Sequence, residues 1–242
     1  KAYIKKCKMS DDAEVLMFPS SYRRAIKYGQ KDAAYEILRT EVLSRLQKQE
    51  KVCIVTYPDA LAEKVVSQKD LAGNTLQVEV GQCIGTDVLV DRLLDDGFQQ
   101  VDYVYEPGQF ALRGSIVDVF SFASEYPYRI DFFGDEVDSV RTFEVETQLS
   151  KEKKQSVSII PELTAMEGGE YVSFFDFLPQ DAILGMKDFL WIRERIETIH
   201  GEAVSPLAVA ADAEREAELS DIGNHLIDGT DFTQKALEFR RM

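Results

Sequence analysis

The chain has 242 residues, of which 45% are hydrophobic and 29% are charged, and its formal net charge is −15. This composition is typical of a globular protein with one large domain or two smaller ones. Tight nucleic-acid binders neutralise phosphates with clustered Lys and Arg, so the acidic charge argues against tight binding of DNA or RNA by this chain. It suits a protein partner with a basic surface.

The cysteines and the hydropathy indicate a cytoplasmic protein. Cys7, Cys53 and Cys83 lie far apart and form no Cys-x-x-Cys pair, which favours a reducing compartment over a disulfide framework or a zinc site. No apolar run approaches the length of about twenty residues that a membrane span needs. The lysine-rich start, KAYIKKCKMSDD, predicts a fragment of something longer.

Residues 1–75 read as the first segment of an α/β domain. Apolar runs at Val15–Phe18 and Val52–Tyr57 predict strands that are buried on both faces, as in parallel sheets. Between them, apolar residues recur at helical spacing: Tyr35, Leu38, Val42 and Leu46. Pro58-Asp59 then predicts the start of a short helix. Strand, helix, strand and helix in this order favour a parallel α/β unit.

Residues 76–161 predict an α+β domain, with an antiparallel sheet, that is inserted into the α/β domain. The alternation in LQVEVGQ predicts a strand with Val78 and Val80 on one face. A helix is expected over Asp87–Asp95, with Thr86 as its N-cap and Gly97 as its stop.

Two tight turns divide the rest of this block into short strands. Pro107-Gly108 lies in the middle of VDYVYEPGQFALRGSIVDVFSF, and Gly134-Asp135 joins the two strands of YPYRIDFFGDEVDSVRTF. Short strands with tight turns are typical of an antiparallel sheet. Because glycine comes first at Gly134-Asp135, this turn suits type II′.

Residues 162–242 return to the α/β domain. Apolar runs recur at Val172–Leu178 and Ala182–Met186. An amphipathic helix ending near His200-Gly201 follows from the spacing of Phe189, Ile192, Ile196 and Ile199. The remaining stretch is acidic and rich in alanine, which predicts a helix or a partly mobile arm.

No nucleotide-binding motif follows either predicted parallel strand. PSSYRR comes after Phe18 and PDALAEK comes after Tyr57, and neither supplies the glycines with which a P-loop wraps phosphates. Gly-x-Gly-x-x-Gly is absent as well. We therefore expect this chain to bind no nucleotide and no other cofactor.

The histidines and cysteines do not form a recognisable catalytic motif. We expect His200 to lie at a helix end, where it meets the helix dipole, and His225 to lie in a tail. Cys53 is expected in a buried strand, as a small core residue. Cys7, although lysines beside it could lower its pKa, is expected to be a surface thiol.

Clustered charges leave two alternatives to a solvated surface. Carboxylates gather around the hairpin at Asp131, Asp135, Glu136 and Asp138. Such a cluster occurs in divalent-metal hydrolases, here with Asp131, Asp135 and Asp138 as the acids. Basic residues gather in a loop at Lys151, Lys153 and Lys154 and in a second group at Arg23, Arg24 and Lys27. Such groups are more often solvated faces than phosphate sites, although the Lys151 loop could bind DNA.

One face of the hairpin carries an unusual mixture of side chains. Period-two alternation puts Ile130 and Phe132 on the core face, and Arg129, Asp131 and Phe133 on the other. Arg113 precedes Gly114, which we expect to mark a bulge or a close backbone approach in the preceding strand. The pattern does not fix whether Arg113 shares the face of Arg129. Arginine and aromatic residues are typical of interface hot spots, so a docking surface and ordinary packing are both open.

Four stretches resemble the transcription-repair coupling factor (Mfd) family. EPGQFALRGSIVDVFSFASEYPYRIDFFGDEVDSVRTFEVETQLS resembles its second domain, which UvrB shares. VLMFPSSYRRAIKYG and KVCIVTYPDALAEKVVS resemble the preceding domain (1a), and FFDFLPQDAILGMKD resembles its return segment (1b). An amino-terminal fragment of UvrB is the alternative, but the Walker A loop and the aromatic-rich hairpin of UvrB are not seen here.

The resemblance implies a non-catalytic, UvrB-like module that recruits UvrA to lesions where RNA polymerase has stalled, in nucleotide excision repair. It places the UvrA-binding residues at Arg113, Arg129 and Phe133. It implies a degenerate helicase-like (P-loop-type) fold for the α/β domain.

The resemblance also implies what lies beyond this chain. Contacts with RNA polymerase and DNA, and the ATP and magnesium of the translocase, belong to domains that this chain lacks. In the full-length family members, the carboxy-terminal domain covers the UvrA-binding surface, which implies autoinhibition.

Overall fold

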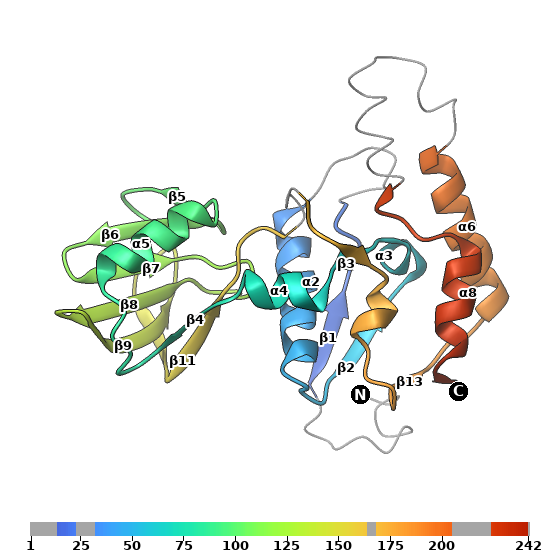
Figure 1. The fold of residues 1–242 in the computed structure, drawn as a ribbon, viewed down its shortest axis with the longest axis horizontal. Coiled ribbons are helices and arrows are strands. Elements are labelled where there is room, and N and C mark those ends of the chain that lie inside the picture. The colour runs from blue at the N-terminus through green and yellow to red at the C-terminus, as the bar shows by residue number, and fades with distance from the viewer. Residues whose placement is uncertain (1–13, 23–31, 164–167, 205–223, 242) are drawn as a thin grey trace, which may run out of the picture. The chain divides into compact units, whose positions relative to one another are not determined.

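A computed structural model of the chain describes residues 14–22, 32–163, 168–204 and 224–241 (Figure 1). The chain divides into two compact units, one formed by residues 1–68 with 169–242 and the other by residues 69–168. Cys7, the group Arg23, Arg24 and Lys27, and most of the acidic alanine-rich stretch lie outside the described residues.

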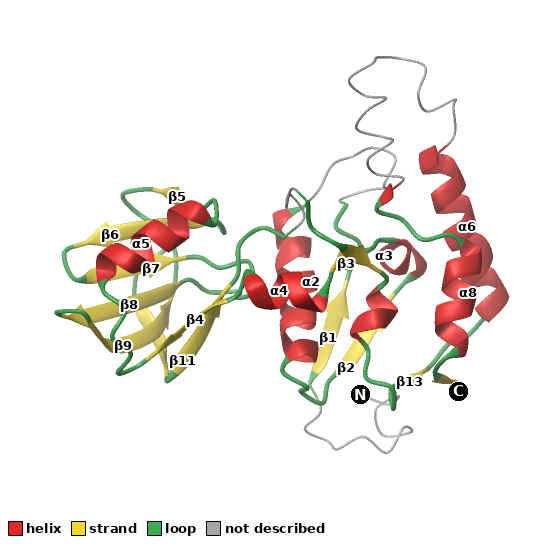
Figure 2. Cartoon of the chain, in the orientation of Figure 1, coloured by secondary structure: helices red, strands yellow, loops and turns green. Residues whose placement is uncertain are grey.

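The first unit contains the predicted parallel strand pair. Strand β1 (Val15–Phe18) pairs with β2 (Cys53–Thr56) in parallel. Between them comes α2 (Ala33–Gln47), and α3 (Pro58–Ala62) follows β2. Figure 2 shows α2 running alongside β1.

Burial of these strands on both faces was predicted, and this prediction is wrong for the described residues. Side chains alternate along β1, so Leu16 and Phe18 are buried whereas Val15 and Met17 are exposed. Cys53, expected in a core, is only half-buried.

Helix α2 buries a different face from the predicted one. Tyr35, Leu38 and Leu46 are only half-buried, whereas Val42 is buried. The buried set includes polar and charged side chains: Glu36, Arg39, Thr40, Val42, Leu43 and Ser44. Hydrophobic spacing mislocated this face because buried polar residues that find partners interrupt the apolar pattern.

The return segment adds short elements to the first unit. β3 (Val65–Val66) pairs antiparallel with β12 (Tyr171–Val172), and a 3₁₀ turn, η2 (Phe174–Phe177), follows. β13 (Ile183–Leu184) pairs in parallel with β14 (Arg240–Arg241). Helices α6 (Phe189–Val204) and α8 (Gly229–Leu237) lie side by side (Figure 1).

Two predictions about this segment are wrong. Helix α6 continues through Gly201 to Val204, so His200 does not cap a helix end. His225 does not lie in a loose tail, because its ring packs edge-on against Tyr171, with 4.2 Å between the ring centroids. Its carbonyl also accepts the Lys64 N–H at 2.8 Å.

In the residues that the structure describes, the second unit contains two sheets in which every strand pair except one is antiparallel, and one helix covers the larger sheet. This unit begins within α4 (Gln68–Gly73), and β4 (Leu76–Glu79) pairs antiparallel with β11 (Ser156–Ile159). The main sheet has six strands in the order β10-β9-β8-β7-β6-β5. Their bounds are β5 Gln99–Gln100, β6 Gln109–Arg113, β7 Ile116–Val119, β8 Tyr128–Phe133, β9 Glu136–Phe143 and β10 Ser150–Lys154.

Helix α5 (Thr86–Asp95) lies over this sheet (Figure 2) and packs against its apolar face. Leu89 and Leu93 pack there in one core with the buried side chains of β7, β8 and β9. The helix ends at the predicted place, since Gly97 has a φ of +82° just beyond the C-cap. Its N-cap is Gly85 and not Thr86, which is already the first helical residue.

Strand β4 is shorter than the alternation in LQVEVGQ predicted. Val78 is fully buried, but Val80 is exposed, because the chain turns after Glu79. Gly81, with a φ of +87°, permits that turn.

No helix in the described parts of the chain is long and apolar enough to span a membrane. The cytoplasmic location stays a prediction.

Candidate protein-docking site

The hairpin of β8 and β9 presents one bare aromatic side chain at its tip. Phe133 pairs with Glu136 across the two-residue turn Gly134-Asp135. Gly134 has a φ of +63°, and Asp135 is not among the residues with positive φ. A type II′ turn requires this combination, because only its first central residue has positive φ.

The predicted alternation along β8 is confirmed. Tyr128, Ile130 and Phe132 are buried, whereas Arg129 and Asp131 are half-buried. Phe133 leaves 84% of its surface exposed. The register shift in this hairpin falls on β9, where Asp138 is the extra residue, so β8 keeps its alternation to the tip.

Strand register answers the question that the sequence left open about Arg113. One row across the sheet joins Arg113, Ile116 and Asp131, and the next joins Ala111, Asp118 and Arg129. Residues two apart on one strand share a face, so Arg113 and Arg129 lie on the same face as Phe133.

The sequence predicted that Gly114 marks a bulge or a close backbone approach, and this prediction is wrong. Gly114 is the first residue of the two-residue turn between β6 and β7, which Arg113 and Ile116 flank as a pair. Its φ is +63°. No atom lies within 4 Å of where a Cβ would sit, so the glycine serves the turn conformation and not a close approach.

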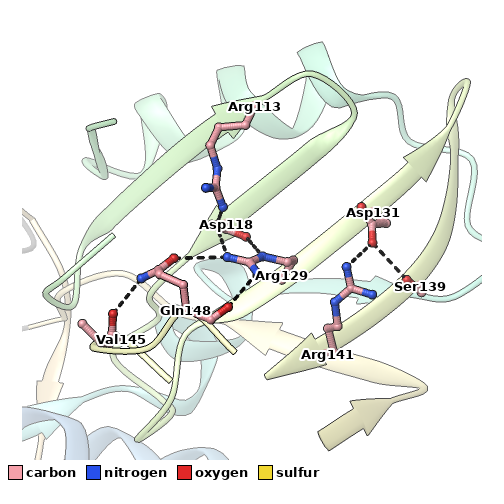
Figure 3. A network of polar contacts seen from close by, with 8 residues as sticks. All are labelled: Arg113, Asp118, Arg129, Asp131, Ser139, Arg141, Val145 and Gln148. Atoms are coloured by element: carbon pink, nitrogen blue, oxygen red, sulfur yellow. Dashed lines mark hydrogen bonds and ion pairs between the residues drawn. The ribbon is translucent and has the colours of Figure 1, made fainter. Parts of the chain in front are cut away.

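A buried carboxylate, Asp118, organises the two arginines (Figure 3). Arg129 Nε donates to Asp118 Oδ1 at 2.7 Å, and Arg129 Nη2 donates to Oδ2 at 2.8 Å. Arg113 Nη2 forms an ion pair with the same Oδ2 atom. A two-point contact of guanidinium with carboxylate fixes the orientation of both groups.

Arg129 is held from several sides and has little free surface. Its Nη1 donates to the Gln148 carbonyl at 3.1 Å, and its Nη2 donates to Gln148 Oε1 at 3.2 Å. Its guanidinium carbon lies 4.3 Å from the centroid of the Phe143 ring. The hydrogen bond with Asp118 raises the pKa of Arg129. Only 12% of the Arg129 side chain is exposed, so its main contacts are internal.

Arg113 is the more accessible of the two cations. Its side chain is 36% exposed, three times the fraction of Arg129. Its guanidinium carbon lies 5.3 Å from the centroid of the Tyr103 ring. Its Nε atom is buried and has no hydrogen-bond partner among the described residues. Asp118 would keep its two bonds to Arg129 if Arg113 moved toward a partner.

The carboxylates around the hairpin do not gather into a metal site. Asp131 is paired with Arg141 Nη2 at 2.5 Å and accepts from Ser139 Oγ at 3.4 Å (Figure 3). Among the described residues, no group of three His, Cys, Asp or Glu side chains is placed to hold a metal ion. The geometry therefore gives no support to the hydrolase alternative with Asp131, Asp135 and Asp138.

The lysines at 151–154 form an edge strand and not the predicted loop. β10 pairs antiparallel with β9 at the end of the six-stranded sheet. Lys154 pairs with Glu152 at 2.7 Å, and Lys151 Nζ lies 3.5 Å from the centroid of the Tyr126 ring. Charged side chains on an edge strand hinder pairing with another chain, which accounts for these lysines without DNA.

Asp118 and Gln148 are the residues that the sequence analysis missed. Asp118 lies in IVDV, where a carboxylate interrupts an apolar strand, and a buried carboxylate needs a partner. That signal could have pointed to Asp118. Gln148 gave no such signal, because it lies in a loop and not in a patterned strand. Its own φ is +60°, and it contacts Arg129 from that loop.

Comparison with known proteins confirms the resemblance. Residues 76–164 match the model of the UvrB interaction domain. The chain is 34% identical over 123 residues to the transcription-repair-coupling factor of Escherichia coli (strain K12) and 30% identical over 151 residues to that of Bacillus subtilis (strain 168). The matched parts cover 51% and 62% of this chain but only 11% and 13% of those relatives, so the chain spans a small part of their length.

Proposed function

We propose that this chain is the non-catalytic, UvrB-like module of a transcription-repair coupling factor and that it recruits UvrA during nucleotide excision repair. The match of residues 76–164 to the UvrB interaction domain supports a docking role for the second unit. The similarity to coupling factors favours this reading over an amino-terminal fragment of UvrB.

The observation that carries the proposal is the exposure of Phe133. An aromatic side chain that is 84% exposed at a hairpin tip has much apolar surface to bury against a partner. Arg113 lies on the same face and is more exposed than Arg129, so it would meet a carboxylate of UvrA. Arg129 would act through Asp118, by holding the sheet face in shape.

The wider role of the full-length protein follows from the same proposal. The first unit would be a helicase-like domain without nucleotide motifs. RNA polymerase, DNA, ATP and magnesium would be bound by other domains of the full-length protein. The carboxy-terminal domain of the full-length protein would cover the face of Phe133 until UvrA is needed.

Calorimetric titration with UvrA tests the proposal. Replacing a hot-spot aromatic by alanine typically weakens binding by about 2 kcal/mol or more, which is roughly 30-fold in Kd. We expect at least this loss for Phe133→Ala and a smaller loss for Arg113→Ala. Because Phe133 is exposed, its removal should change stability by less than about 0.5 kcal/mol.

Val88→Ala is a matched control. Val88 is 54% exposed on α5, the helix that packs on the opposite face of the sheet. The control should bind UvrA as the wild type does. If folded Phe133→Ala binds as tightly as the wild type, the site assignment is wrong.

A further inference from the structure

A buried polar cluster lies where β1 ends in the first unit. In open α/β sheets, ligands bind outside the carboxyl ends of the strands, and the loop after such a strand often holds a phosphate. Here that loop is Pro19-Ser20-Ser21. Its serines are buried together with Arg39 of α2 and with Glu63, which follows α3.

The Glu63 carboxylate is enclosed by hydrogen-bond donors. Ser20 Oγ donates to Glu63 Oε1 at 2.5 Å, and Ser21 Oγ donates to Oε2 at 2.5 Å. The Ser21 N–H donates to both carboxylate oxygens, with distances from its nitrogen of 3.2 Å to Oε1 and 3.1 Å to Oε2. Two hydroxyls and one backbone N–H converge on one negatively charged group, as they do in anion sites.

Arg39 completes the cluster with a positive charge. Its Nη1 atom lies 3.4 Å from Glu63 Oε2 and donates to the Pro19 carbonyl at 2.8 Å. Its guanidinium carbon lies 4.3 Å from the centroid of the Phe18 ring. The Glu63 and Arg39 side chains are 6% and 5% exposed, so this pair is shielded from water.

The backbone around Glu63 is fixed from the other side. Glu63 forms an antiparallel bridge with Leu226. The Lys64 N–H donates to the His225 carbonyl, and the Ile227 N–H donates to the Ala62 carbonyl, both at 2.8 Å. The carboxylate therefore enters the cluster from a backbone that the segment after residue 224 holds in place.

We infer that Ser20, Ser21 and Arg39 form an oxyanion-binding site whose permanent ligand is the chain's own Glu63 carboxylate. The internal ligand excludes external carboxylates and phosphates from the loop after β1. This inference is independent of the proposed UvrA recruitment, since it concerns residues of the other unit.

Chemical complementation tests the inference on the full chain. Glu63→Ala removes the side chain beyond Cβ, and acetate supplies the same heavy atoms. In this variant, we expect acetate to raise the melting temperature by about 2–6 °C, with a dependence on the logarithm of acetate concentration above its Kd. Sodium chloride of equal ionic strength should not raise it, and acetate should not stabilise the wild type beyond the effect of that salt.

Two further variants separate site binding from a general salt effect. Glu50→Ala removes a glutamate whose side chain is 44% exposed and pairs with Arg45 at 3.6 Å, and it should not respond specifically to acetate. Adding Ser21→Ala to Glu63→Ala removes one donor and should reduce the acetate effect by at least half.

If Glu63→Ala does not fold in plain buffer, refolding with and without acetate, followed by Trp191 fluorescence, gives the answer. Recovery with acetate but not with chloride supports the site. Failure of acetate to stabilise or refold the variant overturns it. Stabilisation by inorganic phosphate alone also overturns the assignment of a carboxylate ligand.

Discussion

Removing Arg129 should destabilise the second unit far more than removing Arg113, although both arginines contact the same carboxylate. Asp118 has a side chain that is 2% exposed, and Arg129 supplies two of its hydrogen bonds. Arg129→Ala leaves Asp118 with Arg113 alone and also removes the contacts with Gln148 and Phe143.

The magnitude follows from burial. Breaking a buried ion pair by removing one partner typically costs about 3–5 kcal/mol. Because Arg113 still pairs with Asp118, we expect about 3 kcal/mol for Arg129→Ala. Arg113 is 36% exposed, and its removal leaves the two-point contact intact, so Arg113→Ala should cost about 1 kcal/mol or less.

The assay must report on the second unit alone. Trp191, the single tryptophan, lies in the other unit, so its fluorescence does not monitor this sheet. Amide hydrogen exchange does. The Phe132 N–H, which donates to the Ser115 carbonyl at 2.9 Å, is a suitable probe. A loss of 3 kcal/mol should accelerate its exchange through global unfolding by about two orders of magnitude.

A double-mutant cycle gives the sharpest control. Combining Arg129→Ala with Asp118→Ala removes the stranded carboxylate, so the double variant should lose less stability than the sum of the two single variants. Equal exchange rates for Arg129→Ala and Arg113→Ala would refute the distinction between the two arginines.

Two further predictions concern the turns and the first unit. Gly114→Ala should lower the free energy of unfolding by about 1–2 kcal/mol, because alanine is strained at a φ of +63°. Gly73 also has no atom within 4 Å of where a Cβ would sit but lacks a positive φ, so Gly73→Ala should be neutral or stabilising. Hydrogen exchange in the second unit measures both effects. Burial raises the pKa of Tyr57, with smaller contributions from Glu63 and Asp59. The folded state therefore favours the neutral phenol, and this contribution to the free energy of unfolding is fully present below about pH 10 and is lost as pH rises through the raised pKa. Tyr57→Phe should therefore flatten the alkaline decline in stability followed by Trp191 fluorescence, and an unchanged decline would contradict this account.

Local patterns predicted the turn and the alternation of the β8–β9 hairpin because this information is local. Turn chemistry places Gly134 first, and period-two alternation assigns every side chain of β8 to a face. Both depend on residues within a few positions of each other. These patterns left open whether Phe133 packs back onto the sheet, and the structure answers this with an exposed fraction of 84%.

The partners of Arg129 could not be predicted in this way. Asp118 reaches it through the pairing of β7 with β8, and Gln148 reaches it from a loop after β9. Which strands pair, and in which register, depends on the whole sheet and not on a local pattern. The buried face of α2 was mispredicted for the same reason. Arg39 is buried because it forms an ion pair with Glu63, which lies 24 positions away in the chain.

The contrast between Phe133 and the arginines has a consequence for how this face would recognise a partner. Asp118 already forms an ion pair with Arg113 in the free protein, although it shares its single charge with Arg129, so a partner carboxylate gains less than the full energy of a new ion pair. Exchanging one ion pair for another adds little affinity. It does favour partners whose carboxylates are correctly placed, and it raises the association rate at low salt. Phe133 has no such competitor, and burying an exposed phenylalanine contributes about 1.5–3 kcal/mol. Affinity should therefore depend mainly on the aromatic tip, and specificity on the charged row beside it.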